Sequence, residues 1–264
     1  MRAFRLAYDG TPYHGFQRQP DVPTVEGELF AALTRLGVRS GTRPDGYAAA
    51  GRTDAGVSAV AQTVAFHCPE WLSPRALNSE LPGAVRAWAS TETSADFHAT
   101  HDATEREYTY HLWAPEASLD RASAALDALA GTHDFHNLTP DDELTTRTLE
   151  TNLSVDGSYL IITLRAGGFS RQLVRRVVGL VEAVAHAERD DIDRVLSSEE
   201  LSGPDGVPNA PPEPLVLTGV EYPNLSFERD STAVKNASRI FETKRIERET
   251  GARTAGTIAK IVKN

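Results

Sequence analysis

The sequence contains very little cysteine, and it has no long apolar run. Its single cysteine, Cys68, excludes an internal disulfide and a zinc site built from several thiolates. The longest apolar stretch, residues 177–187, is interrupted by Glu182 and His186, which is untypical of a membrane span. The N-terminal residues also lack the apolar core of a secretory signal. We therefore expect a cytoplasmic protein that does not bind membranes.

Lysine is absent from most of the chain, and positive charge is unevenly distributed. The formal net charge is −10, but residues 229–264 carry nine Lys or Arg against four Asp or Glu. This segment is therefore +5 and residues 1–228 are −15. The chain's four lysines all belong to the basic segment: Lys235, Lys244, Lys260 and Lys263. We interpret the acidic, lysine-poor body as a sign of a high-salt cytoplasm, where salt screens charge over a few ångströms.

Hydrophobic periodicity and turn residues predict the same order of elements twice. In the first half the predicted elements are a strand at 4–8, a helix from Thr24 to Gly37, strands at 47–50 and 60–67, a helix from Ser73 to about Leu81, and a strand at 85–89. In the second half they are a strand at 108–112, a helix from Ser118 to Gly131, strands at 149–155 and 159–164, a helix opened by Ser170, a short helix near 191–198, and a strand at 215–222.

Each half thus reads strand, helix, strand, strand, helix, strand, which is the ferredoxin-like pattern. Two such units predict an α+β fold with one extended, mainly antiparallel sheet, helices on one face and a cleft on the other. We place the halves at residues 1–104 and 105–228. Residues 229–264 form a basic C-terminal extension, in which we expect a helix that Gly251 interrupts.

Residues 51–59 hold an aspartate between two glycines, in the sequence Gly-Arg-Thr-Asp-Ala-Gly-Val-Ser-Ala. The glycines let the loop turn sharply and present Asp54 to a ligand. Arg52 is close enough to keep that carboxylate ionised, as a nucleophile requires. Taken alone, the same residues are also typical of a solvated surface turn with an incidental ion pair.

Two further residues are candidates for the same site. Arg175 lies at the edge of a strongly apolar helix, where an unpaired guanidinium would be costly, so Asp54 or another carboxylate must lie close to it. A structural ion pair without a catalytic role is the alternative. Tyr108 could offer a flat surface to a nucleobase, although its alternation with Tyr110 is also typical of a strand aromatic facing the core.

Histidine pairs are candidates for metal binding, and glycine-rich loops are candidates for nucleotide binding. The histidine pairs with three-residue spacing are His98 with His101 and His133 with His136. Neither pair adds a cysteine or a clear third ligand, so we predict no metal site. The loops at 51–56 and 167–168 lack the spacing of a phosphate-binding loop, so we predict no nucleotide cofactor.

Motifs in a fixed order over residues 4–222 resemble the tRNA pseudouridine synthase A (TruA) family. The matching stretches are YDGTPYHGFQRQ at 8–19, TVE at 24–26, GRTDAGVSA at 51–59, LPG at 81–83, DFHA at 96–99, REYTY at 106–110 and LVRRVVG at 173–179. The sequence departs from the family at Ser58 and at residues 170–172, where histidine is more usual.

The resemblance implies a pseudouridine synthase fold with a central RNA-binding cleft. It implies an isomerase that converts uridine to pseudouridine in the anticodon stem-loop of tRNA, at positions 38, 39 and/or 40. Asp54 would be the catalytic nucleophile and Tyr108 would pack against the target base. Arg175 would pair with the catalytic carboxylate, and Arg52 would contact the RNA. It also implies a homodimer that binds tRNA, and no cofactor, because the product is an isomer of the substrate.

Holding RNA and extruding a base both need positive charge near the cleft. Besides Arg175 and the basic extension, the candidates are Arg18, Arg165, Arg171 and Arg176. One alternative function is a non-catalytic RNA-binding module, which would need stacking aromatics but not Asp54 with two arginines. A second is a glycosidase that uses a carboxylate to release the base. That enzyme usually needs a second acid, for which the sequence offers no clear candidate.

Overall fold

The computed structural model describes residues 1–39 and 41–263, so Asn264, the last residue of the predicted extension, lies outside the described residues. The strands are β1 Arg2–Tyr8, β2 Ala48–Ala49, β3 Ser58–Phe66, β4 Val85–Glu92, β5 Glu105–Trp113, β6 Gly131–Asp134, β7 Thr146–Asp156, β8 Tyr159–Ala166, β9 Leu215–Glu221 and β10 Glu228–Arg229. The helices are α1 Val25–Arg35, α2 Pro74–Asn78, α3 Leu119–Leu129, α4 Leu173–Ala185, α5 Ile192–Val195 and α6 Ser231–Lys263, with short 3₁₀ turns η1 His136–Leu138 and η2 Gly203–Asp205.

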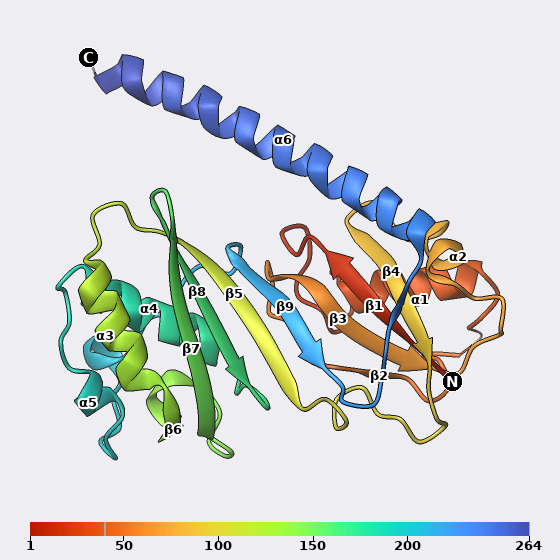
Figure 1. The fold of residues 1–264 in the computed structure, drawn as a ribbon, viewed down its shortest axis with the longest axis horizontal. Coiled ribbons are helices and arrows are strands. Elements are labelled where there is room, and N and C mark those ends of the chain that lie inside the picture. The colour runs from red at the N-terminus through yellow and green to blue at the C-terminus, as the bar shows by residue number, and fades with distance from the viewer. Residues whose placement is uncertain (40, 264) are drawn as a thin grey trace.

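The ten strands form one sheet in the order β10-β4-β1-β3-β9-β5-β8-β7-β6, with β2 paired to β3 (Figure 1). The first half contributes β4-β1-β3-β2 and the second half β9-β5-β8-β7, so the same strand order occurs twice. The halves meet where β3 and β9 pair in parallel, and the other paired strands of the described residues are antiparallel. The predicted α+β class with an extended, mainly antiparallel sheet is confirmed.

Each half has its own hydrophobic core beneath the sheet. Alternate residues of β1, such as Phe4 and Leu6, pack with Leu29 and Leu33 of α1 in the first core. A separate cluster built on α3, α4, β5 and β8 forms the second core. A fully buried leucine or phenylalanine contributes about 1.5–3 kcal/mol through burial, so the two cores hold the two halves rigidly. Tyr108 is partly buried and contacts both of them.

Most helix starts follow the predicted caps, with one exception. The side chains of Thr24, Ser73 and Ser118 each accept a hydrogen bond from a backbone amide in the first turn of α1, α2 and α3. The prediction that Ser170 opens α4 is wrong, because its hydroxyl instead donates to the carbonyl oxygen of Leu144 at 3.2 Å. The helix begins at Leu173, after Gln172 in the left-handed region at φ 61°.

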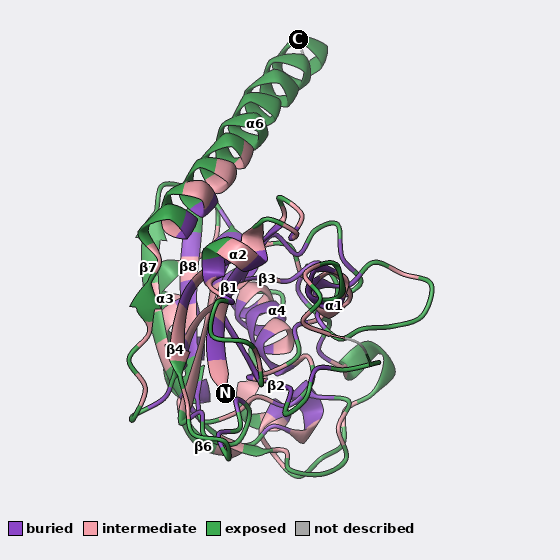
Figure 2. Cartoon of the chain, turned by 90° about the vertical axis from the view of Figure 1, so that its right-hand side faces the viewer, coloured by how far each residue is buried: buried purple, intermediate pink, exposed green. Residues whose placement is uncertain are grey.

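The predicted interruption of the C-terminal helix at Gly251 is also wrong. Helix α6 continues through this glycine to Lys263, since a glycine costs a helix only about 1 kcal/mol relative to alanine and does not break its hydrogen bonds. The first part of α6 packs against β4 and α2 and buries Ala233 and Ala237. Figures 1 and 2 show the rest of the helix leaving the body and ending away from it.

Candidate active site

A pocket of about 1170 Å³ opens on the face of the sheet that carries α1 and α4. Figure 2 shows these two helices on the same side of the sheet. Glu26 and Phe30 of α1 line one wall, and the first turn of α4 lines the other. The prediction of a cleft on the face without helices is therefore wrong, because the helices of the two halves stand apart and leave the sheet between them accessible.

The junction between the halves forms the floor of the pocket. Ala59 of β3 pairs with Leu217 of β9, which in turn pairs with Tyr108 of β5. A β-bulge shifts the register of β5 against β9 between Glu107 and Tyr108. Such bulges redirect side chains and are common beside active sites. Because the loop that carries Asp54 leads directly into β3, the fold brings Asp54 and Tyr108 to the same pocket.

Residues 10–16 pack tightly against the loop that carries Asp54. Gly15 has a φ of +95°, and a Cβ there would lie 3.0 Å from the carbonyl oxygen of Thr53. A Cβ on Gly10 would overlap the carbonyl group of Val57. The amide of Phe16 donates to the carbonyl oxygen of Thr53 at 3.0 Å. Only glycine fits at both positions, so the fold holds the Asp54 loop in place before any ligand binds.

Side chains beneath the loop add to this support. The hydroxyl of Tyr8 lies 2.8 Å from the Thr53 hydroxyl in the interior, where burial raises the pKa of Tyr8 and keeps it neutral. The amide of Gln62 donates to the carbonyl oxygen of Gly51 at 2.9 Å. Ser58, one of the departures from the family pattern, accepts a hydrogen bond from the amide of Gly10 at 3.0 Å. The residue at 58 therefore ties two loops together.

Asp54 forms an ion pair with Arg175 across the pocket. The Arg175 Nη1 to Asp54 Oδ2 distance is 3.4 Å, and the carboxylate side chain is 40% exposed against 16% for the arginine. The Nε of Arg175 also donates to the carbonyl oxygen of Ala210 at 2.7 Å. The guanidinium is thus held by a carbonyl on one side and presents its positive charge to Asp54 on the other, while the carboxylate stays accessible to a ligand.

Sequence reasoning missed the loop that orients Arg175. Residues 207–214 carry Ala210, whose amide also donates to the carbonyl oxygen of Arg175 at 3.0 Å. The loop lies directly against α4, because a Cβ on Gly179 would collide with the carbonyl oxygen of Pro208. A glycine in the middle of an otherwise apolar helix was the available signal, since it marks a close approach of another backbone.

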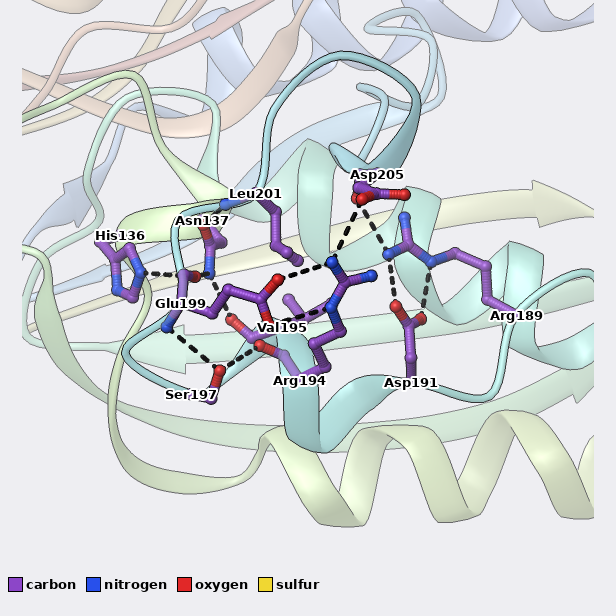
Figure 3. Close-up of polar contacts among 10 residues, drawn as sticks. All are labelled: His136, Asn137, Arg189, Asp191, Arg194, Val195, Ser197, Glu199, Leu201 and Asp205. Atoms are coloured by element: carbon purple, nitrogen blue, oxygen red, sulfur yellow. Dashed lines mark hydrogen bonds and ion pairs between the residues drawn. The ribbon is translucent and has the colours of Figure 1, made fainter.

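A polar network at α5 holds the base of that loop (Figure 3). Arg194 bridges the carboxylates of Glu199 and Asp205, at 2.6 and 3.1 Å. Arg189 pairs with Asp191 and donates to the backbone carbonyl of Asp205 at 3.1 Å. Asn137 donates to the carbonyl oxygen of Glu199 at 2.8 Å. These contacts fix the segment just before Ala210, so they act on the site through the position of its backbone.

Tyr108 lies on the pocket floor beside a second aromatic side chain, Phe169, which also lines the pocket. Its ring meets that of Phe169 edge-on, with centroids 5.2 Å apart. Burial raises the pKa of Tyr108 to about 12, with the charge of Arg106 opposing this and that of Asp54 adding to it. Tyr108 is therefore a neutral phenol at physiological pH, with a flat face and a hydroxyl donor.

The predicted cationic residues divide into two groups. Arg18, Arg52 and Arg171 line the pocket, and Arg171 is fixed there by Asp141 through an ion pair of 2.5 Å. Arg52 is exposed, and the described residues give its side chain no ion pair. Arg52 is thus available to an anionic ligand at the pocket's rim.

Arg165 and Arg176 do not line the pocket, so their predicted place near the cleft is wrong. Arg165 pairs with Glu107, the neighbour of Arg165 across the β5–β8 ladder. Arg176 follows Arg175 by one residue, which turns it about 100° around α4, where it donates to the carbonyl oxygen of Asn137 at 3.3 Å.

Residues 1–39 and 41–263 contain neither a cluster of metal ligands nor a helix that could cross a membrane. No group of three or more His, Cys, Asp or Glu side chains there is arranged to hold a metal ion. The rings of His98 and His101 lie 4.2 Å apart, and His98 lines the pocket. Within the same residues, none of the helices has the length and apolar character needed to cross a membrane.

Comparison with known proteins points to one family. The profile of a family described as tRNA pseudouridine synthase matches residues 125–223. The chain is 59% identical to tRNA pseudouridine synthase A of Haloarcula marismortui, over 98% of each chain. It is 56% identical to the protein of that name from Halobacterium salinarum, over 98% of this chain and 99% of the other. The protein of that name from Methanothrix thermoacetophila is 38% identical over 90% of each chain.

Among solved structures, the chain is similar to one described as the crystal structure of the archaeal box H/ACA sRNP Nop10-Cbf5 complex. The TM-score is 0.38 with 13% sequence identity, and the match covers 70% of this chain and 43% of the other.

Proposed function

The chain belongs to the tRNA pseudouridine synthase A family of isomerases, and on this premise we propose that it acts on the anticodon stem-loop of tRNA, at position 38, 39 or 40, with Asp54 as the nucleophile. The ion pair between Asp54 and Arg175, inside a pocket lined by both halves of the chain, carries the proposal. An accessible carboxylate beside a fixed guanidinium is the arrangement that nucleophilic catalysis requires.

The reaction exchanges one bond of the nucleotide for another. Asp54 attacks the target uridine, and the bond between N1 of the uracil and C1′ of the ribose breaks. The freed uracil turns within the pocket and its C5 bonds to C1′. The bond between Asp54 and the nucleotide breaks and restores the carboxylate, the C5 hydrogen leaves as a proton, and N1 gains a proton. The pocket, at about 1170 Å³, exceeds the usual 300–1000 Å³ of a small-ligand site, so it leaves space for this rotation. No oxidant, reductant or nucleotide cofactor enters the balance.

The other pocket residues supply binding and orientation. Extruding the uridine from its helix costs a few kcal/mol of lost stacking. Stacking on the flat face of Tyr108 compensates for part of that cost. Arg52 and Arg18 at the rim contact phosphates of the flanking nucleotides, which positions the RNA without reading its sequence.

A tritium-release assay tests the proposal. Transfer RNA made with tritium at C5 of uridine would be incubated with the protein, and free tritium and free uracil would be measured. The proposal expects tritium release without free uracil. Free uracil would instead indicate a glycosidase, and binding without either product would indicate an RNA-binding module. Mapping pseudouridine in tRNA from a strain lacking the protein would show whether positions 38 to 40 are the targets.

The neutral state of Tyr108 gives a testable pH dependence. Since burial raises the pKa of Tyr108 to about 12, the reactive form at pH 8–10 is the phenol. We expect kcat to change less than about threefold over this range. If tyrosinate were the working base, the rate would rise about tenfold per pH unit below the pKa, and Tyr108→Phe would remove that rise. Single-turnover tritium release at fixed ionic strength distinguishes the two.

The resemblance to the family also suggests an oligomeric state and a cellular compartment for the protein. We propose that the protein is a homodimer in the cytoplasm and that one tRNA contacts both subunits. Sedimentation equilibrium, with and without tRNA, measures the subunit number. A monomer at all concentrations would exclude the dimer and leave the chemistry at Asp54 unaffected.

A further inference from the structure

We propose that residues 250–263, the outer part of α6 and here called the arm, bind the sugar–phosphate backbone of tRNA outside the anticodon stem-loop. The inference rests on the proposed function, since it takes tRNA as the substrate. It assigns a partner surface to a part of the chain that contributes nothing to the pocket.

A buried carboxylate anchors α6 just before the arm begins. Asp9, at 5% side-chain exposure, accepts an ion pair of 2.7 Å from Lys244 and another of 2.7 Å from Arg248. Asp9 directly precedes Gly10, which packs on the Asp54 loop at Val57. The anchor of α6 is thus built onto the same segment that supports the candidate nucleophile, and the direction of the arm is fixed relative to the pocket.

Beyond Arg248 the helix has no packing partner in the described residues. Residues 250–263 are all exposed, and in both views the C-terminal end of α6 lies away from the pocket walls α1 and α4 (Figures 1 and 2). At 1.5 Å per residue the arm is roughly 21 Å long. An arm of this length reaches RNA well beyond the nucleotides that a pocket between α1 and α4 can hold.

The charge of the arm identifies its partner as a polyanion. The arm contains Arg253, Lys260 and Lys263 and no acidic residue, so it is +3, whereas residues 1–228 are −15. Spacings of seven and three residues place the three cations on one face of the helix. An acidic body repels RNA, so cations displaced from it on a projecting helix are the ones best placed to meet phosphates.

The composition of the arm requires a partner as well. Two glycines, three threonines and several β-branched residues lie in its fourteen positions, and each is a poor helix former. A segment of this length is marginal as an isolated helix in water. Binding to phosphates neutralises the mutual repulsion of its cations and stabilises the helix, so the arm gains order when tRNA binds.

A second copy of the chain fits the arm less well. Ile258 and Val262, at 59% and 80% exposure, offer some apolar surface for a protein contact. Two arms side by side, however, would bring six positive charges together with no acidic residue inside either arm, and Glu249, just before the arm, already pairs with Arg253 of its own helix at 3.0 Å. A protein interface made by this segment is therefore the competing outcome of the test below.

The Asp9 anchor gives a prediction about stability. Burial by itself would raise the pKa of Asp9, but bonds from Lys244, Thr11 and Arg248 outweigh it and hold this pKa well below its usual range. A carboxylate with a lowered pKa in the folded state stabilises the fold above its unfolded pKa of about 3.9, and this contribution is lost as the pH falls.

Asp9→Asn should therefore lower the midpoint of thermal unfolding by about 3–10 °C at neutral pH. The difference from the wild type should stay constant above about pH 5 and shrink below about pH 4. Thermal unfolding monitored by circular dichroism across that range measures it. A difference that grew on acidification would contradict the anchor.

The arm itself is tested with a charge variant and a matched control. The charge variant carries Arg253→Gln, Lys260→Gln and Lys263→Gln. The control carries Thr250→Gln, Thr254→Gln and Thr257→Gln, which changes as many positions in the same stretch and keeps every charge. Each protein is titrated with full-length tRNA and with the isolated anticodon stem-loop over a range of salt concentrations.

We expect the charge variant to bind full-length tRNA at least about tenfold more weakly at 0.1 M salt. The slope of log K against log salt concentration should be less negative by about 2–3, because up to three phosphate contacts are lost. Affinity for the isolated stem-loop should stay within about twofold. The control keeps every charge and replaces threonine by a better helix former, so it should keep the wild-type salt slope on both RNAs and bind full-length tRNA no more weakly than the wild type.

An unchanged salt slope on full-length tRNA would overturn the proposal. If, in addition, an Ile258→Glu, Val262→Glu variant had a lower native mass than the wild type, the arm would be a protein interface instead. Failure of the proposed function is detected separately, because it requires that the wild type release no tritium from tRNA, whatever the salt slope of binding.

Discussion

Asp54→Ala will abolish pseudouridine formation, with kcat reduced at least about 10⁴-fold, while the Kd for tRNA changes less than about tenfold. The side chain is the nucleophile of the proposed reaction, and removing it leaves no other carboxylate of the Asp54 loop to replace it. Binding survives because phosphate contacts from the rim arginines and the arm supply most of the affinity. Single-turnover tritium release and filter binding on the same preparation measure both quantities.

Two further variants make this result specific. Asp54→Asn keeps the shape of the side chain and loses its charge and nucleophilicity, so it should be as inactive as the alanine variant. Asp45→Ala removes another acid from the first half, one that does not line the pocket, and its kcat should stay within about twofold. Activity of Asp54→Ala within about a hundredfold of the wild type would remove Asp54 as the nucleophile.

The main elements of the fold follow from local patterns in the sequence. Alternation in β1, the stripe of α1 and the caps at Thr24, Ser73 and Ser118 depend on neighbouring residues, so the sequence contains them directly. The predicted cleft failed for a different reason. Which face of a sheet remains open depends on how far apart α1 and α4 stand, and no local pattern encodes that distance.

The candidate site, too, could be predicted from the sequence only in part. The glycines around Asp54 and the apolar setting of Arg175 pointed to these two residues, since each needs a particular backbone or partner. The β-bulge before Tyr108 and the carbonyl of Ala210 come from segments distant in the chain, so neither could be predicted. The prediction for Arg165 was wrong because its side chain pairs with Glu107 on the neighbouring strand and does not line the pocket, and a pairing between distant strands cannot be predicted from local sequence.

Arg175→Gln will lower kcat by about 10²–10³-fold and leave the KM for tRNA within about threefold. The guanidinium contacts Asp54 at 3.4 Å and Ala210 at 2.7 Å, and it supplies the positive charge that keeps the nucleophile oriented. Glutamine can still donate to the Ala210 carbonyl, so the loop stays in place while the charge is lost. Single-turnover tritium release over a range of tRNA concentrations separates kcat from KM.

Arg175→Lys separates charge from geometry. A lysine ammonium keeps the positive charge but cannot bond Asp54 and the Ala210 carbonyl at the same time, as the arginine does with two different nitrogens. Its kcat should therefore lie between those of the wild type and Arg175→Gln. Arg176→Gln, the adjacent arginine that points to Asn137, is the matched control and should retain kcat within about twofold. If Arg175→Gln and Arg176→Gln were equally active, the Asp54 pair would be a structural contact, and the nucleophile would be oriented by its glycine-bounded loop alone.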